Sequence, residues 1–286
     1  MRSVREFARP LTRRLRRPVE AFRHPGNRGH RVRAVLRALR FLARGLVGRT
    51  TIVPLGHSSR VVADARETNS PKAVVNAIPD RPEMLVWMKR LGKGDLFVDV
   101  GANVGLYSIV AAEAGADVIA IEADRGTAER LRENLRLNGY GAEIVEKAVS
   151  DRSGSGRLTT GLDSYNHLVL DDSPGLSIAT TTLDEVIGKR TVAGMKIDVQ
   201  GAEMLVLQGA RTLLQEQRIR CLQMEWNGLS TELLGEPRSM IANLLQGFGY
   251  VMHRAEESGD LRPAHDDIAE GRRDMFALPR PSLGGG

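Results

Sequence analysis

The stretch Phe97-Val-Asp-Val-Gly-Ala-Asn-Val-Gly105 decides the fold of this chain. An apolar strand runs into Asp99 and a turn bracketed by two glycines, and a helical pattern begins at Leu106. Gly101 and Gly105 allow the backbone to come close to a ligand and allow the helix to pack against the strand. The stretch therefore predicts a nucleotide-type pocket at the carboxyl end of a strand.

A second acid, Glu122, ends the next apolar run at residues 117–122. A carboxylate there can accept hydrogen bonds from two ribose hydroxyls, which suggests adenosine. The Gly-x-x-x-Gly loop lacks the further glycine with which Gly-x-Gly-x-x-Gly loops seat a pyrophosphate on a helix N-terminus. No Gly-x-x-x-x-Gly-Lys-Ser/Thr loop occurs either, so the pattern favours an adenosine ligand without phosphate, such as S-adenosylmethionine. The alternative is a tight strand–helix turn with two solvated acids.

Composition indicates an ordinary globular chain. It has 286 residues, of which 42% are hydrophobic, and one cysteine, Cys221, so no intramolecular disulfide can form. Cys221 lies in an apolar run and is expected to be a small core residue rather than a nucleophile. A reducing cytoplasm fits this cysteine usage. No apolar run reaches the length that spans a bilayer, and arginines interrupt every candidate secretory signal.

The net charge of +6 is unevenly distributed. Residues 1–49 hold fifteen Arg and no Lys against two Glu, which gives +13, so the rest of the chain must carry −7. This basic arm has three prolines in residues 1–27, which are expected to be poorly ordered.

A basic amphipathic helix is predicted over residues 30–47, with Val and Leu on one face and four Arg on the other. It could pack on the catalytic body or on a second subunit, or it could adsorb peripherally to the anionic inner face of a membrane. Binding to a polyanion is the third alternative; nucleic acid is disfavoured because no aromatic residues are interleaved for stacking.

The body alternates strand-like and helix-like segments. After a connecting region at residues 50–94, with a hairpin of 51–55 and 60–64 and an entry helix at 83–91, the main domain spans residues 95–280. Predicted strands are 96–100, 117–122, 142–147, 193–198 and 219–226, and predicted helices are 105–114, 125–138, 180–187 and 201–217. This alternation predicts an α/β fold with a parallel sheet. Residues 249–253 and 274–278 should add an antiparallel hairpin, and residues 152–180 should form a long functional loop.

The parallel arrangement gathers acids along one rim of the sheet, where open α/β sheets bind ligands. The five acids at or just after strand ends are Asp99, Glu122, Asp151, Asp198 and Glu225.

The motifs resemble those of FkbM-type S-adenosylmethionine-dependent methyltransferases over about residues 80–280. The resemblance rests on the first strand and its glycine loop, then Ile121-Glu-Ala-Asp124, Leu-x-x-Asn-x-x-x-Asn138, Ala148-Val-Ser-Asp151, Thr182-Leu-Asp184 and Met195-Lys-Ile-Asp-Val-Gln-Gly-Ala-Glu203. Gln200 stands where the family usually carries Glu, and Ala123 stands where Pro is common. The resemblance implies a class I methyltransferase, Rossmann-like fold: a mostly parallel seven-stranded sheet with an antiparallel last strand. It also implies O-methylation of a hydroxyl on a sugar, glycolipid or polyketide-like product.

Within this resemblance each site residue has an expected role. Asp99, Gly101, Asn103 and Gly105 would hold the methionine end of the cofactor, and Glu122 the ribose hydroxyls. Ser150 and Asp151 would contact the adenine edge, although a solvated turn acid is an alternative for Asp151.

Catalysis requires a group that accepts the proton of the acceptor hydroxyl. Asp198 could be this base, a metal ligand or a pocket wall. Glu225 could pair with it, and the two acids could then hold a divalent cation. His167 is the alternative base in the 152–180 loop, although a lone loop histidine is usually solvated. Glu203 is expected to act as a cap or to pair with Lys196.

Tyr107 and Trp226 are expected to line the pocket or to belong to the core. Two rival functions stay open. One is an NAD-type oxidoreductase, against which the missing glycine argues. The other is a non-catalytic module that docks on a membrane or partner through the basic arm. The sequence leaves the oligomeric state and the identity of the small-molecule or glycan acceptor open.

Overall fold

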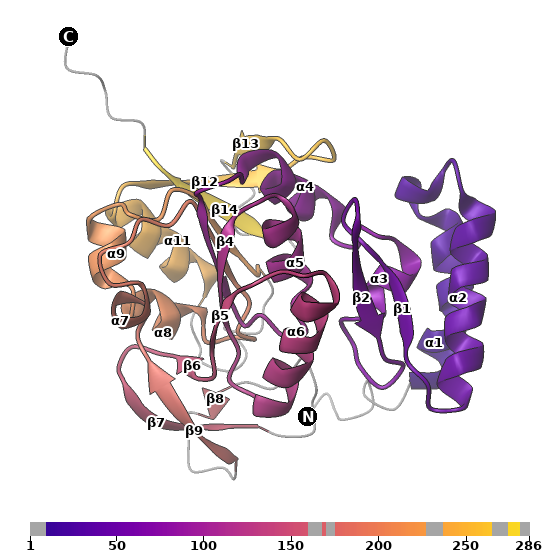
Figure 1. Ribbon diagram of the computed structural model, residues 1–286. Coiled ribbons are helices and arrows are strands. Elements are labelled where there is room, and N and C mark those ends of the chain that lie inside the picture. Colours follow the sequence, from indigo (N-terminus) through magenta and orange to yellow (C-terminus); the bar gives the residue numbers. More distant parts are fainter. Residues whose placement is uncertain (1–9, 160–167, 170–174, 227–236, 265–273, 281–286) are drawn as a thin grey trace. The chain divides into compact units, whose positions relative to one another are not determined.

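The computed structural model describes residues 10–159, 168–169, 175–226, 237–264 and 274–280. The chain divides into two compact units, Met1–Arg81 and Pro82–Gly286. Figure 1 shows the elements of both units in sequence colours. In the described part of the chain, no helix is both long enough and apolar enough to cross a membrane.

The first unit combines helices with a two-stranded hairpin. Its elements are α1 (Pro10–Arg23), η1 (Pro25–Asn27), α2 (Arg31–Leu46), β1 (Thr51–Leu55), β2 (Ser59–Ala63) and α3 (Lys72–Val75). The antiparallel pairing of β1 with β2 confirms the predicted hairpin. Asn27 fastens η1 by donating to the carbonyls of Ala21 and Val75, at 2.7 and 2.9 Å.

One expectation for this unit needs correction, and another is confirmed. Residues 10–23 form α1 rather than a poorly ordered segment, because Ala21 is buried and the Arg17 guanidinium lies 5.1 Å from the centroid of the Phe41 ring on α2. The predicted amphipathic helix is confirmed as α2. It packs within its unit through Ala34, Ala38 and Phe41, and most of the large side chains of its Val and Leu face are exposed.

The second unit is built on an eight-stranded sheet in the order β13-β12-β14-β11-β10-β3-β4-β5. Its strands are β3 (Leu96–Val100), β4 (Asp117–Ile121), β5 (Glu143–Val145), β10 (Gly194–Ile197), β11 (Leu222–Met224), β12 (Tyr250–Ala255), β13 (Leu261–Pro263) and β14 (Met275–Pro279). Strands β5, β4, β3, β10 and β11 run parallel, and β14 is antiparallel to both its neighbours. This confirms the α/β fold with a reversed last strand, to which the short β13 is added at the edge.

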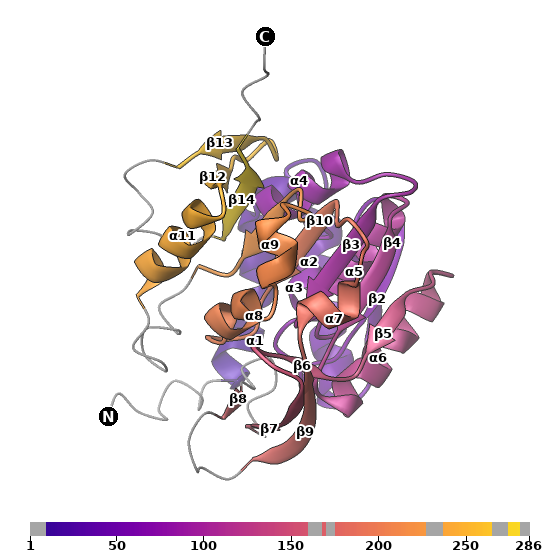
Figure 2. The ribbon, with the colours of Figure 1, turned by 90° about the vertical axis from the view of Figure 1, so that its left-hand side faces the viewer.

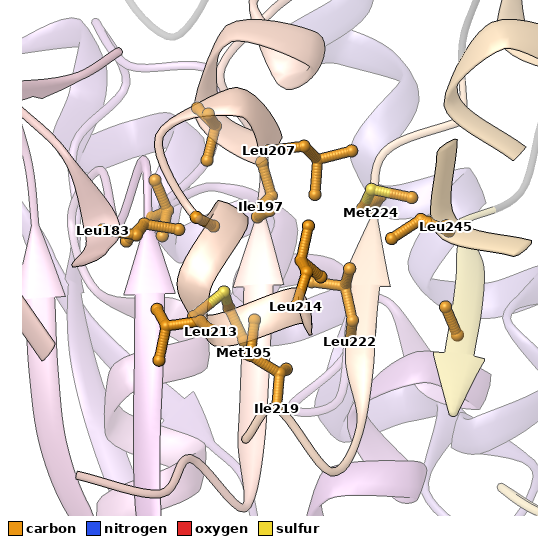
Figure 3. Close-up of a cluster of buried hydrophobic side chains, with 14 of the residues drawn as sticks. Leu183, Met195, Ile197, Leu207, Leu213, Leu214, Ile219, Leu222, Met224 and Leu245 are labelled. Atoms are coloured by element: carbon orange, nitrogen blue, oxygen red, sulfur yellow. The ribbon is translucent and has the colours of Figure 1, made fainter. Parts of the chain in front are cut away.

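Helices cover both faces of this sheet, as Figure 2 shows from the side. They are α4 (Arg81–Arg90), α5 (Leu106–Glu113), α6 (Arg125–Leu137), α7 (Leu183–Ile187), α8 (Glu203–Gln208), α9 (Arg211–Gln215) and α11 (Arg238–Gly247). On one face, buried side chains of β10 and β11 pack against α8, α9 and α11, as in Figure 3. The alternating residues of the same strands point to the opposite face, where the polar residues of the site lie.

The predicted long loop at 152–180 is wrong for its described part. There β7 (Gly154–Leu158), β8 (Leu168–Val169) and β9 (Leu176–Thr181) join β6 (Ala148–Val149) in a second sheet. β6 and β8 have only two residues each and β7 has a single apolar residue, so the sequence holds little of the sustained apolar alternation that identifies a strand.

Two predicted helices also differ from the structure. The predicted helix 180–187 begins only at Leu183, because Thr182 is its N-cap and accepts the N–H of Glu185 at 3.2 Å. The predicted helix 201–217 is divided into α8 and α9 at Gly209. A Cβ at Gly209 would lie 2.1 Å from the carbonyl oxygen of Ser150, so the chain needs glycine at this close approach.

Candidate active site

The turn after β3 brings the two halves of the site together. The N–H groups of Gly101 and Ala102 both donate to the carbonyl of Ile121, at 2.9 and 3.0 Å. Gly101 has a φ of +77°, and a Cβ on it would lie 2.0 Å from the carbonyl oxygen of Asp198. Glycine is therefore required here both by conformation and by the strand end that passes over it. Asn103 also lies in the left-handed region, with a φ of +52°.

Glu122, at the end of β4, fastens this turn. Its carboxylate accepts the N–H of Asn103 and the N–H of Asp124, each at 2.9 Å. Burial raises the pKa of Glu122 to about 7, against the lowering by these two hydrogen bonds. Each oxygen keeps a lone pair, so the carboxylate can still accept hydrogen bonds from a ligand. The predicted contact with ribose thus fits the chemistry of this group.

Asp99 lies inside the protein and connects two elements of the fold, which the sequence does not predict. It is 1% exposed and accepts the hydroxyl of Ser108 at 2.6 Å, which joins β3 to α5. Burial raises its pKa, while the charge of Lys196 opposes that rise. Its predicted contact with the methionine ammonium stays a prediction, since here the carboxylate faces other side chains.

Ser150 and Asp151 follow β6 of the second sheet rather than a strand of the main sheet. The Ser150 hydroxyl donates to Asp151 at 3.0 Å, and the Asp151 side chain is about one-third exposed. The pair is therefore preordered, and the carboxylate is open to solvent. Contact with an adenine edge stays a prediction for both residues.

A buried polar row crosses the sheet beneath α4 and α5. Lys196 on β10 pairs in register with Asp99 on β3 and with Gln223 on β11. The Lys196 ammonium lies 4.7 Å from the centroid of the Tyr107 ring. Gln223 accepts a hydrogen bond from the indole N–H of Trp87, and its amide nitrogen donates to the hydroxyl of Tyr107 at 3.3 Å. Aromatic rings thus shield this row from water.

At the rim, the row continues into a pair of carboxylates bridged by an amide. Lys196 Nζ donates to Asp198 Oδ2 at 2.8 Å. Gln200 Nε2 donates to Asp198 Oδ1 at 2.6 Å and to Glu225 Oε2 at 2.8 Å. Gln200 is 8% exposed with a φ of +55°, and its Oε1 has no hydrogen-bond partner within the described structure. Both amide hydrogens are therefore committed, while one buried acceptor is left available.

Charge in this cluster is distributed between one cation and several acids. Burial alone lowers the pKa of Lys196, but Asp198, Asp99 and Asp274 together raise it above its ordinary value. Burial and the neighbouring Asp198 carboxylate raise the pKa of Glu225. Lys196 is thus charged at neutral pH, and Glu225 holds its proton more strongly than an exposed glutamate does.

Several expected residues have other roles. Glu203 accepts the N–H of Gly201 at 3.1 Å, in the turn that precedes α8. Tyr107 and Trp226 are 7% and 1% exposed, so they belong to the core. Cys221 is a buried core residue as expected.

The base candidate His167 lies outside the described residues. Among those described, no group of three or more His, Cys, Asp or Glu could hold a metal ion, so the divalent cation that Asp198 and Glu225 could hold gains no support.

Sequence reasoning missed Gln223 and Asp274 and gave Lys196 only a minor role. Asp274 precedes β14 and accepts the Gln223 amide at 2.6 Å. A signal existed for two of them: Lys196 and Gln223 are single polar residues inside the apolar runs of β10 and β11. A polar residue on a strand that is buried on both sides needs a partner, which marks a buried network.

Comparisons with solved structures find distant likenesses. An rRNA methylase from Streptococcus thermophilus is 9% identical, with a TM-score of 0.41, over 69% of this chain and 93% of that chain. The Pyrococcus abyssi tRNA (uracil-54, C5)-methyltransferase is 12% identical, with a TM-score of 0.45, and the match covers 80% of this chain and 43% of that one. For a ribosomal protein L11 methylase from Lactobacillus delbrueckii subsp. bulgaricus the values are 14% and 0.44, over 80% and 98%.

A search of the curated proteins finds no match. The family model of the methyltransferase FkbM domain matches residues 99–252, from the acid of the first strand to the penultimate long strand of the sheet. That match spans more than half of the chain. It includes the glycine turn after β3, the Glu122 carboxylate that fastens this turn, and Asp99, Lys196 and Gln223 of the polar row. The chain therefore belongs to the FkbM methyltransferase family.

Proposed function

We propose that this protein is an S-adenosylmethionine-dependent O-methyltransferase that acts on a hydroxyl of a sugar, a glycolipid or a related natural product. The observation that carries the proposal is the placement of the Asp198 carboxylate. It lies at the end of β10, its side chain is 30% exposed, and Lys196 and Gln200 hold both its oxygens. Such a group can accept a proton in a fixed geometry.

The residues around the first crossover fit this cofactor. The turn from Gly101 to Gly105 has the left-handed conformations that bring backbone close to a ligand. Glu122 has acceptor capacity left for two hydroxyl groups, and Asp151 presents an open carboxylate. When bound, S-adenosylmethionine supplies an electrophilic methyl group on a positively charged sulfur.

Proton transfer is then the task of this chain's own residues. Asp198 would accept the proton that the acceptor hydroxyl loses when it is methylated. Lys196 and Gln200 keep the carboxylate in place, which converts a random encounter into an oriented one. Glu225, with its raised pKa, keeps a proton and so does not add a second negative charge beside Asp198 at neutral pH.

Two measurements test this function. Calorimetric titration with S-adenosylmethionine and with NAD separates the proposed cofactor from that of an oxidoreductase; binding of NAD alone would overturn the proposal. Mass spectrometry of candidate sugar and glycolipid extracts, incubated with the enzyme and an isotopically labelled methyl donor, should show labelled methyl ethers.

The Asp198→Asn variant tests the proposed base. It keeps the size of the side chain but should lower kcat by on the order of 100-fold or more, with cofactor affinity within about threefold. Arg211→Gln, on the exposed start of α9, is a control that should leave both quantities unchanged. If the Asn variant keeps full activity, Asp198 is not the base.

A further inference from the structure

Helix α2 is fixed in its unit by a side that is not its most apolar one. Ala34, Ala38 and Phe41 are at most 1% exposed and face the interior. Arg37 donates to the carbonyls of Val74 and Val75, at 2.8 and 3.1 Å. This side therefore makes the contacts that hold α2 within residues 1–81, and the opposite side of the helix is left exposed.

That opposite side carries the large apolar residues. Val32, Leu36, Leu39 and Leu46 are 70%, 59%, 48% and 82% exposed. Their spacing of four, three and seven residues places them on one face of the helix, which we call the α2 stripe. In Figure 1, α2 forms an outer edge of its unit, with the β1–β2 hairpin and α3 on one side of it. A contiguous apolar stripe of this length on an exposed helix indicates an interaction surface.

Exposed arginines lie beside the α2 stripe and elsewhere in the same unit. Arg33 and Arg40 each follow a stripe residue by one position, so they line one flank of it. Seven exposed arginines lie between residues 16 and 49, against one exposed acid, Glu20; they are Arg16, Arg23, Arg28, Arg31, Arg33, Arg40 and Arg49. Within the described structure these seven form no ion pair. The surface thus combines apolar side chains with positive charge that has no internal counterpart.

We propose that the α2 stripe and its arginines dock the protein on an anionic lipid bilayer. Leucine and valine side chains enter the boundary between head groups and acyl chains, while the flanking guanidinium groups contact lipid phosphates. A second copy of the chain fits less well, because two arginine-rich faces would repel each other. A nucleic acid fits less well too, because it has no apolar phase for the exposed leucines.

Vesicle co-sedimentation of the full chain tests the proposal. The protein should bind vesicles of phosphatidylcholine mixed equally with phosphatidylglycerol, and should not bind phosphatidylcholine alone. The Leu36→Ser/Leu39→Ser variant should lose at least about tenfold in affinity. Leu176→Ser/Met240→Ser removes two side chains of similar exposure from the other unit and should stay within about twofold of the natural protein.

Charge is tested in the same assay. Arg33→Gln/Arg40→Gln should weaken binding roughly 30-fold, because each arginine near an anionic surface contributes about a fivefold factor. Arg211→Gln/Arg220→Gln has the same net charge and also changes two exposed arginines, but in the other unit, and should bind as the natural protein does. Equal loss in both charge variants would mean attraction by net charge alone and would overturn the proposal.

A direct probe of insertion completes the test and does not depend on affinity. A tryptophan placed by Leu39→Trp should shift its emission to the blue and be quenched by lipids brominated on their acyl chains. Absence of quenching overturns the proposal. So does a dimer, seen by light scattering, that disappears in the Leu36→Ser/Leu39→Ser variant while the natural protein ignores vesicles. Binding to duplex DNA that this variant leaves unchanged, without vesicle binding, would assign the surface to nucleic acid instead.

Discussion

Replacing Lys196 by methionine should destabilise the second unit strongly, and more at neutral than at acidic pH. The lysine side chain is 5% exposed and lies 2.8 Å from Asp198, with Asp99 in register on the neighbouring strand. Lys196→Met keeps most of the volume but leaves buried carboxylates without a cation. Breaking a buried pair in this way costs about 3–5 kcal/mol of unfolding free energy. With a urea m-value near 3 kcal/mol per molar, the midpoint should fall by roughly 1–1.7 M.

Urea unfolding followed by tryptophan fluorescence measures this effect in the right unit. Trp87 and Trp226, the two tryptophans of the chain, are both 1% exposed and both lie beyond residue 81. Lys189→Met, at an exposed position, is the matched control and should change the free energy of unfolding by less than about 0.5 kcal/mol.

The pH dependence follows from the sign of two shifts. Lys196 has a raised pKa, so its stabilisation is present at all pH values below its ordinary value and does not change between about pH 5 and 7.5. In the variant, Asp99 loses the charge that opposes its raised pKa. An acid whose pKa is raised in the folded state favours folding at low pH, and this contribution is lost as the pH rises. The loss of unfolding free energy in Lys196→Met should therefore be smaller near pH 5. An equal loss of unfolding free energy at both pH values, or a loss below about 1 kcal/mol, would refute this reasoning.

Three further predictions follow from the rim. Gly101→Ala should lower the urea midpoint far more than Gly139→Ala, since both have positive φ but only the first Cβ meets a backbone oxygen, at 2.0 Å; equal shifts would contradict the steric argument. The affinity for S-adenosylhomocysteine, measured by calorimetry, should rise from about pH 6 to 8, because Glu122 has a pKa of about 7 and ionises over this range. The Glu122→Gln variant should bind more weakly, and its affinity should not change with pH. Gln200→Glu adds a third carboxylate to the pair that the amide bridges, so it should destabilise the protein by on the order of 1–3 kcal/mol at about pH 8 and less at pH 6, by the same fluorescence measurement.

The sequence predicts well the strands that are buried on both sides. Strands β3 and β4 are near-continuous apolar runs, and their predicted bounds agree with the structure to within one residue. The second sheet was missed because β7 reads Gly-Ser-Gly-Arg-Leu, with little apolar alternation. Its stability comes from pairing with β9 across the sequence, which a local pattern does not contain.

The sequence predicts the helix α2 but leaves the partner of its Val and Leu face open, for a physical reason. A hydrophobic pattern assigns the leucine side to the interior, but helices that pack closely on their neighbours bury small residues such as Ala34 and Ala38. The pattern identified the helix and its bounds to within one residue at each end. It could not identify which side has a partner, because that depends on elements far away in the chain.

For the site, sequence order places acids at strand ends but does not give the direction or the partners of their side chains. The sequence predicts a ligand contact for Asp99 but not the hydrogen bond that its carboxylate accepts from the hydroxyl of Ser108 on α5. The sequence alone does not identify Asp198 as the partner of Lys196, because a lysine inside a strand has several acids within reach. The structure identifies the pair by the short distance between the two side chains. Such networks depend on contacts between strands, and their only sign in the sequence is a lone polar residue in an apolar run.

Gln200 shows how backbone and charge act together at the rim. A non-glycine residue with φ of +55° costs on the order of 1–3 kcal/mol and persists only where its surroundings fix it. The two hydrogen bonds from its amide to Asp198 and Glu225 supply that constraint, and each is charge-assisted when its acceptor is ionised. The same bonds orient the carboxylate of Asp198. Backbone strain and the orientation of the proposed base are therefore one structural feature, and a change that relaxes the first should also release the second.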